Sequence, residues 1–295
     1  MERQLVQHGA STLMVSLPKP WLDKQQLRKG DSVHIVEAEN RLIITEKEKK
    51  REDKHTDIHF SHNNYSEIRN ILGKLYRESY NSIRITYNNP KCLYSIQIIC
   101  TALQGFEIIE QSDKGCLVKN VVREISINTN EMMSKVINII KTEFIVVREY
   151  LKEGIKGKED EIRTLRDDCW KYRNMVYLQL KESILSLAFE DYFIIHLAEY
   201  NASFLYWLYR SFDKSNIEKV SAGFLTIYDE VQNYFNNSIH KVNDKDYVTY
   251  IMDTRDKLLK ESEQYALKNS SDRFLIIYLT MIIQNLQNHK TMVVA

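Results

Sequence analysis

Apolar residues follow three different patterns along the chain, and the changes between them predict where its folded parts begin and end. Short apolar runs separated by turn-forming residues fill residues 1–46. Helical spacing mixed with strict alternation follows, and from residue 125 onward apolar residues recur every three or four positions. The sequence therefore predicts a multidomain α+β protein.

Residues 1–46 have the pattern of two strand pairs separated by a short helix. Gly9 and the small residues after it form a turn between the first two apolar runs, and Pro20 presets the backbone of a first helical turn. Asn40 lies in the turn of the second pair. A unit of about 45 residues buries little apolar surface, so we expect it to dimerise. The predicted elements are strands at 5–8 and 13–17, a helix over 20–26, and strands at 33–37 and 42–45.

Residues 47–64 carry a run of mixed charges with nothing apolar to bury, which predicts a charged linker. His55, His59 and His62 lie in this segment at spacings of four and three. On a helix the three rings would share a face and could bind a transition metal. No helical pattern begins there, so we expect a solvated or partner-facing loop instead.

Residues 65–122 combine two helical patterns with three alternating ones. Helical spacing is seen over 68–76 and 93–103, while 82–87, 106–110 and 116–122 have the character of strands. Pro90 and Gly115 lie in the breaks. We therefore expect a small α-β-α-β-β module. It contains no phosphate-binding loop or catalytic constellation, so we interpret it as a packing module.

From about residue 125 to 290 long helices are predicted, because no proline follows Pro90 and no glycine follows Gly223. Gly154 and Gly157 end the first helix, and polar breaks lie near 213–216, 243–244 and 269–271. The apolar stripes amount to six helices, which divide into two three-helix repeats. His196 and a group of aromatic residues share one helix; we expect them to be core, rim or partner-groove side chains. The aromatic residues are Tyr200, Phe204, Tyr206, Trp207 and Tyr209.

Residues 1–46 resemble the AbrB/SpoVT/MazE swapped-hairpin domains. The resemblance rests on five landmarks in order: Leu17-Pro18, Trp21, Leu27, Gly30-Asp31-Ser32-Val33 and Leu42-Ile43-Ile44. It implies an intertwined homodimer that docks a basic surface on DNA. The DNA-binding residues that we expect are Arg3, His8, Ser11, Thr12, Lys19, Lys24, Arg28 and Lys29.

The charge pattern leaves a second interpretation open. The basic residues of this unit would each be presented twice in a dimer, which suits phosphate contacts. The whole chain, however, has a formal net charge of only +1, and Leu22 and Asp23 stand where the family usually has two arginines. The alternative is a pure dimerisation module whose basic residues form a solvated face.

Residues 125–290 resemble the PhoU family of phosphate-uptake regulators, in an arrangement found in archaeal fusions with an AbrB-like domain. Arg166-Asp167-Asp168, Gln179-Leu180 and the run 253–258 carry this resemblance. The family commonly holds iron or zinc on helix carboxylates. Here Cys169 and Lys171 replace expected acids, and Glu199 is followed by Ala202 and Ser203. We therefore expect no metal and no cofactor.

Composition narrows the functional classes. With 295 residues, 43% of them hydrophobic and 27% charged, the chain is typical of a soluble globular protein. We expect a cytoplasmic protein with no membrane insertion, because neither a signal peptide nor a long uncharged apolar stretch is seen. The four cysteines lack C-x-x-C spacing, which favours buried thiols. Nucleotide-binding and hydrolase motifs are absent, so we expect no enzyme activity.

Two functions fit these patterns. The first is a dimeric DNA-binding transcriptional regulator, linked by the PhoU resemblance to phosphate uptake or phosphate signalling. The second is a protein-interaction adaptor, in which the N-terminal domain only dimerises and the helical part binds a phosphate transporter or a sensor kinase.

Overall fold

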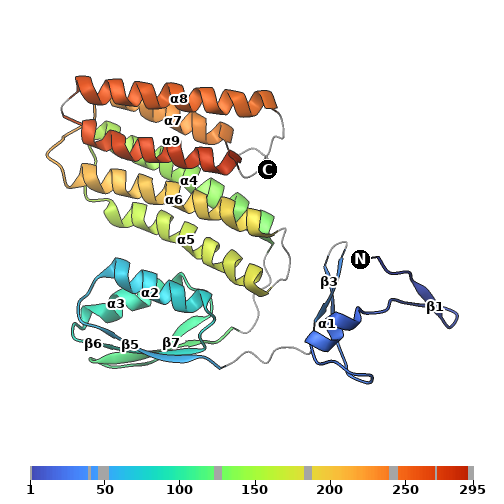
Figure 1. Cartoon of the computed structure of the whole chain (residues 1–295). Helices are drawn as coiled ribbons and strands as arrows, with labels where there is room; N and C mark the ends of the chain where they lie inside the picture. The colour runs from blue at the N-terminus through green and yellow to red at the C-terminus, as the bar shows by residue number, and fades with distance from the viewer. Residues whose placement is uncertain are drawn as a thin grey trace. The chain divides into compact units, whose positions relative to one another are not determined.

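A computed structural model describes residues 2–38, 41–45, 53–122, 128–182, 188–238, 245–269 and 271–291. The chain divides into two compact units, residues 1–53 and residues 54–295. Unit 1 contains the two hairpins and the short helix. Unit 2 contains a four-stranded sheet with its helices, followed by the long helices (Figure 1). Each unit is described separately below.

Unit 1 forms the elements that its sequence pattern predicts. The strands are β1 (Val6–His8), β2 (Thr12–Met14), β3 (His34–Ala38) and β4 (Arg41–Thr45), and the helix is α1 (Lys19–Lys24). They pair as two separate antiparallel hairpins, β1 with β2 and β3 with β4. The predicted turn residue Asn40 lies outside the described residues.

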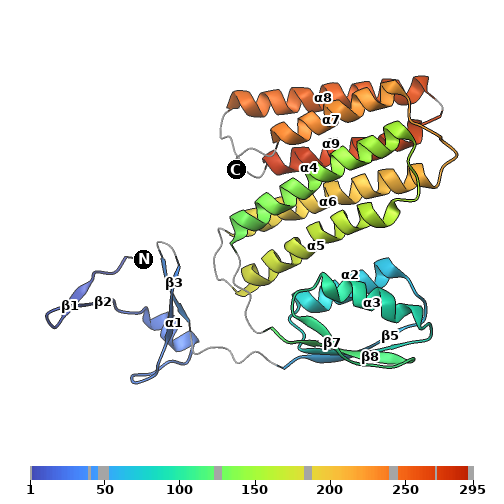
Figure 2. The ribbon, with the colours of Figure 1, turned by 180° about the vertical axis from the view of Figure 1, so that it is seen from behind.

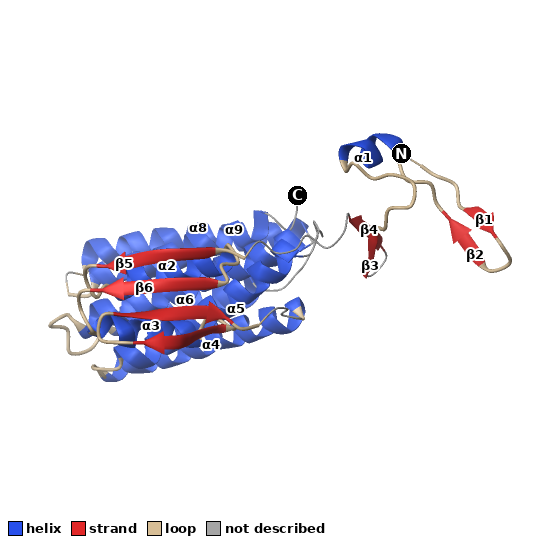
Figure 3. Cartoon of the chain, turned by 90° about the horizontal axis from the view of Figure 1, so that it is seen from below, coloured by secondary structure: helices blue, strands red, loops and turns tan. Residues whose placement is uncertain are grey.

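The first part of unit 2 is an α/β module. Its elements are β5 (His55–Phe60), α2 (Tyr65–Arg77), β6 (Ser82–Tyr87), α3 (Lys91–Thr101), β7 (Phe106–Gln111) and β8 (Gly115–Asn120). The sheet order is β5-β6-β8-β7, with β5 and β6 parallel and β8 antiparallel to both of its neighbours. Both helices cover the same face of the sheet, as Figures 1 and 3 show together. The α-β-α-β-β prediction for residues 65–122 is confirmed, and one further strand precedes it.

Strand β5 corrects the prediction of a linker over residues 47–64. The polar residues His55, Asp57 and His59 are exposed, while Ile58 and Phe60 pack toward the core of the module. This alternation is the ordinary pattern of a strand with one buried face. The neighbouring charge run obscured it, and residues 46–52 lie outside the described residues.

Two of the three histidines, His55 and His59, belong to the exposed face of the sheet, while His62 lies in the loop that follows β5, as predicted. His55 Nδ1 lies 2.6 Å from Ser82 Oγ, and His59 Nδ1 lies 2.9 Å from Thr86 Oγ1. Both hydroxyls come from the parallel neighbour β6, in register with the histidines. Two histidines four positions apart on a strand are roughly 13 Å apart, which is too far to share one metal ion.

The second part of unit 2 is a bundle of six long helices among the described residues. They are α4 (Thr129–Glu153), α5 (Glu159–Glu182), α6 (Ala188–Asp213), α7 (Ala222–Ser238), α8 (Lys245–Lys268) and α9 (Ile276–Thr291), the last preceded by the short turn η1 (Arg273–Leu275). Helices α4, α5 and α6 pack on one another, as do α7, α8 and α9, and the groups meet through α6–α9 and α4–α7. Figure 2 shows α4 and α7 from the side opposite to Figure 1.

The helix boundaries follow the predicted breaks where the structure describes them. Gly154 ends α4 in the left-handed conformation, with φ of 73°, which glycine adopts without a side-chain clash. The break predicted at 243–244 lies outside the described residues. Over the described ranges, none of these helices combines the length and the apolar character that crossing a membrane requires.

All four cysteines are buried and free, as the sequence pattern predicts. Cys92, Cys100 and Cys116 lie in the core of the module, and Cys169 lies in the core of the bundle. Burial raises the pKa of Cys100 to about 12 and that of Cys116 to about 11, so both remain protonated thiols near neutral pH.

Trp170 joins the module to the bundle. It is 2% exposed, and it belongs to the same hydrophobic cluster as the core of the module although it lies on α5. Its ring packs against Gly73 of α2, where an added Cβ would lie 2.6 Å from Trp170 Cζ2. Arg69 of α2 lies over the same ring, 4.4 Å from its centroid. Only a residue without a side chain lets α2 approach the indole this closely.

A cluster of charged residues surrounds this contact. Asp167 of α5 accepts a hydrogen bond of 2.6 Å from the Tyr65 hydroxyl and lies 3.3 Å from Arg69 Nε. Glu199 of α6 lies 3.3 Å from Arg69 Nη2 and 2.8 Å from Arg173 Nη1. Two acids that the PhoU resemblance places among metal ligands are thus paired with arginines. In the described ranges, no three His, Cys, Asp or Glu side chains are grouped so that they could hold a metal ion.

Glu143 of α4 lies deeper in the bundle, near Arg166 and Asp167 of α5. Its side chain is fully buried, and neither carboxylate oxygen has a hydrogen-bond partner. Burial raises the pKa of Glu143 well above its ordinary range, against the attraction of Arg166. A protonated carboxyl avoids most of the cost of burying a charge.

We predict that Gly73→Ala destabilises the protein. Alanine favours a helix over glycine by about 1 kcal/mol, but overpacking against a rigid indole costs about 1–3 kcal/mol. Urea unfolding of the full chain measures the balance, with Lys74→Ala on the exposed side of α2 as the control. A Gly73→Ala variant more stable than the wild type would contradict the close packing.

We predict that Glu143→Gln stabilises the protein increasingly as pH rises. The folded-state pKa of Glu143 is raised, so its contribution to stability is present below the ordinary value of about 4.3 and is lost as pH rises through the folded value. Near pH 8 the variant should be more stable by about 1–3 kcal/mol. Urea unfolding between about pH 4 and about pH 8 measures this difference. Parallel curves for the two proteins would refute it, and Glu131→Gln, on the exposed surface of the same helix, is the control.

Candidate nucleic-acid interface

The first hairpin is set by a tight turn between two very short strands. Val6 pairs with Met14, Gln7 with Leu13, and His8 with Thr12. Gly9 has a φ of 75°, a left-handed conformation that favours glycine in this turn. Three of the predicted DNA-binding residues, His8, Ser11 and Thr12, therefore lie at the tip of the hairpin.

Helix α1 is held by proline at its start and by a compact turn at its end. Pro18 is the N-cap and Pro20 lies in the first turn, where the missing N–H costs nothing. After the helix, the Arg28 backbone N–H donates to Asp31 Oδ2 at 2.6 Å. This carboxylate fixes the turn that carries Arg28 and Lys29.

The eight predicted DNA-binding residues are all exposed and fall into two groups. Arg3 precedes the hairpin whose tip carries His8, Ser11 and Thr12. The second group consists of Lys19 and Lys24 on α1 and of Arg28 and Lys29 in the turn after it. Leu22 of α1 is half-buried and Asp23 is exposed, so one acid lies among the four cations of this group.

The apolar residues of unit 1 are exposed to an unusual degree. In the first hairpin, Leu5 is 64% exposed, Val6 60% and Leu13 62%. Leu13 and Val6 point to opposite faces, because Val6 pairs with Met14 and side chains alternate along a strand. The hairpin therefore has apolar residues on both faces, which is typical of a strand pair that other chain segments cover from both sides.

The second hairpin also exposes apolar side chains. Ile35 is 56% exposed and Leu42 is 70% exposed, and they lie on the same face of the β3–β4 pair. The described part of unit 1 contains no hydrophobic side chain that is fully buried. The side chains of unit 1 whose exposure is described thus form no core of the kind that a stable domain needs.

Comparison with known families identifies residues 7–53 as similar to the MazE family, described as antidote-toxin recognition MazE, bacterial antitoxin. The matched range coincides closely with unit 1. A domain of this type suggests DNA binding, antitoxin activity or self-association. No curated protein and no solved structure matched the chain.

Proposed function

We propose that two copies of the chain associate through unit 1 and that this dimer binds DNA as a transcriptional regulator. The observation that carries the proposal is the exposure of apolar residues on both faces of the first hairpin. A second copy can cover these faces, and a symmetric dimer would present each basic residue twice. The similarity to the MazE family supports the same interpretation.

Electrostatics favours DNA as the ligand of such a dimer. Lys19, Lys24, Arg28 and Lys29 are exposed within the thirteen positions from 19 to 31, which also contain Asp23 and Asp31. Doubling the four cations supplies enough positive charge for several phosphate contacts. Two-fold symmetry in the protein would select a pseudo-symmetric operator. We propose a role in binding and regulation without catalysis.

The link to phosphate uptake or phosphate signalling stays a prediction, as does a transporter or sensor-kinase partner. Both rest on the resemblance of the helical part to the PhoU family. The adaptor function is favoured by a separate observation, an exposed apolar surface on the bundle, which the next subsection describes.

We predict that Leu13→Asp dissociates the dimer. A charge placed at an apolar position of the hairpin would have to be desolvated when a second copy covers it. Light scattering after size exclusion should give the mass of one chain for the variant and of two chains for the wild type. The helical circular-dichroism signal of unit 2 should not change.

Ser32→Asp provides the control for Leu13→Asp, because it adds the same charge at an exposed polar position of unit 1. It should leave the mass unchanged. A wild-type chain that has the mass of a monomer at micromolar concentration would contradict dimerisation through unit 1.

We predict that Lys24→Ala weakens DNA binding and makes it less sensitive to salt. Each phosphate contact contributes about one unit to the slope of log affinity against log salt, so a dimer that loses two contacts should lose about two units. Gel shifts between about 50 mM and about 200 mM salt measure the slope. Lys260→Ala, at an exposed lysine of α8, is the control and should change neither quantity. DNA affinity that is independent of salt would rule out the proposed contacts.

A further inference from the structure

One face of the helical bundle carries a strip of exposed apolar side chains across two neighbouring helices. We call it the α6–α9 strip. The members from α6 are Tyr200, Phe204 and Trp207, and those from η1 and α9 are Phe274, Ile277 and Met281. Ile277 is 53% exposed, Phe274 43%, Tyr200 42%, Trp207 38% and Met281 37%, while Phe204 is partly buried.

Hydrogen bonds fix the two helices side by side in antiparallel register. Ser211 Oγ of α6 lies 2.7 Å from the Tyr278 hydroxyl of α9. At the other end of the seam, Asn285 Nδ2 donates to Asn201 Oδ1 at 2.7 Å and to the Leu197 carbonyl at 2.8 Å. Positions three and four apart on each helix share a face. We therefore place the six side chains along the seam between α6 and α9, which lie side by side in Figure 1.

The aromatic residues of α6 divide between two environments. Tyr206 and Tyr209 are buried in the core of the bundle, and their hydroxyls make hydrogen bonds with the α4–α5 connection and the start of α5. Tyr200 and Phe204 instead stack on each other at the surface, with ring centroids 6.2 Å apart. The first pair belongs to the core of the bundle. In the second pair Phe204 packs against that core from its edge, while Tyr200 is 42% exposed.

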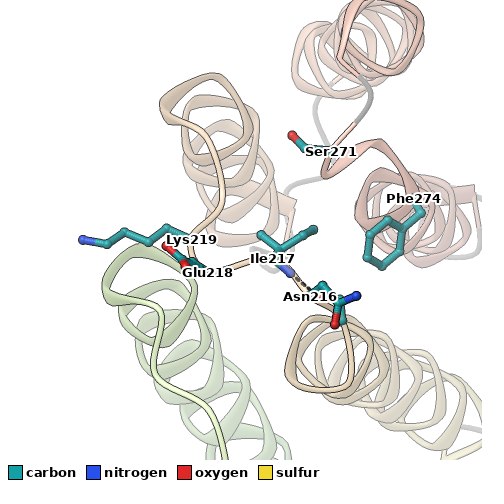
Figure 4. Close-up of a pocket in the computed structure, with 7 residues that line it drawn as sticks. Asn216, Ile217, Glu218, Lys219, Ser271 and Phe274 are labelled. Atoms are coloured by element: carbon teal, nitrogen blue, oxygen red, sulfur yellow. Dashed lines mark hydrogen bonds between the residues drawn. The ribbon is translucent and has the colours of Figure 1, made fainter.

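A pocket of about 680 Å³ continues the strip at one end. The α6–α7 connection and the α8–α9 connection line it, as Figure 4 shows. The ring of Phe274 and the side chain of Ile217 flank the opening, and the other five lining residues are polar or charged, so the pocket is an open hollow with two apolar side chains. Asp272 holds the two connections together, because its Oδ2 accepts from the Ser221 backbone N–H at 2.8 Å and its Oδ1 accepts from the Tyr265 hydroxyl.

The charges beside the strip and the pocket are mainly positive. Lys219 lines the pocket, and Arg273 begins the turn that carries Phe274. Arg210 lies over the Trp207 ring at 5.1 Å, at the edge of the strip, and its Nε also lies 3.5 Å from Glu159 Oε1, so its charge is partly balanced within the bundle. Glu218 is the acid among the residues that line the pocket. This surface is therefore complementary to an apolar ligand that carries negative charge.

We propose that the α6–α9 strip binds an amphipathic helix of a partner protein, with an apolar ridge in the seam and acidic residues beside the pocket. A seam between two helices accepts a third helix whose apolar residues recur every three or four positions. Exposed apolar patches rimmed by polar residues are typical of such interfaces. This interaction does not depend on DNA binding by unit 1.

Synthetic peptides test the proposal on the full chain. The first peptide is an amphipathic helix with leucines at i, i+3, i+4 and i+7 and glutamates at one end, and the second replaces those glutamates with lysines. Fluorescence anisotropy should detect binding of the glutamate peptide and at least about tenfold weaker binding of the lysine peptide. Ile277→Asp should weaken binding of the glutamate peptide at least about tenfold.

Matched variants separate this site from unspecific adsorption. Ile145→Asp places the same charge at an isoleucine of α4 that is 58% exposed, and it should bind the glutamate peptide like the wild type. Lys219→Glu combined with Arg273→Glu should reverse the preference between the peptides. DNA binding should be the same in Ile277→Asp and in the wild type, so failure of either proposal can be recognised by itself.

Three results would overturn the proposal. The first is absence of binding of the glutamate peptide. The second is equal binding of both peptides with equal effects of the Ile277 and Ile145 substitutions. The third is an assembly of the full chain larger than a dimer that Ile277→Asp dissociates, because the strip would then be an interface between copies of this chain.

Discussion

The approach of α2 to Trp170 determines how the second unit is built. Trp170 belongs to α5, a helix of the bundle, but its indole packs in the core of the module. Gly73 of α2 is the position that gives the indole room there. Two side chains of α5, Trp170 and Leu178, belong to the core of the module, and the module and the bundle form one compact unit despite their different folds. We expect the arginine-carboxylate pairs around Trp170 to fix the orientation of α2 against α5, rather than to add much net stability.

Unit 1 has the opposite character. Its hairpins form correctly from local turn chemistry, yet their apolar residues are exposed on both faces of the first strand pair. A domain of this size rarely has enough core of its own, and association with a second copy is one common way to supply it. Self-association, as proposed above, would supply unit 1 with the core that its described part lacks, whereas unit 2 contains its own two hydrophobic clusters. We expect the two units to differ in how their stability depends on protein concentration.

Much of this architecture could be predicted because it depends on local patterns. The turn at Gly9, the proline-started helix α1 and the glycine-capped end of α4 follow from single residues with narrow backbone preferences. Strand β5 was missed, since its alternation is short and follows a charge run that dominates the local composition. The pairing of Arg69 with Asp167 and Glu199 could not be predicted either, because it joins positions about a hundred residues apart in the chain. Periodicity shows which face of a helix is buried but not what it meets.

The candidate interfaces, too, could be predicted from local patterns only in part. The exposure of Lys24 and Arg28 could be predicted from their charge, but the surface that they form depends on a second copy, and neither the sequence nor the structure of one chain contains it. For α6 the sequence shows a concentration of aromatic residues, and only the packing of α9 beside it divides them into core and surface. Tyr209 is fully buried while Trp207, two positions earlier, is 38% exposed, so neighbours in sequence serve different purposes. Trp207 packs edge-on against the buried Tyr206 and still leaves more than a third of its surface exposed beside other apolar side chains, which is the physical reason to regard that surface as a binding site.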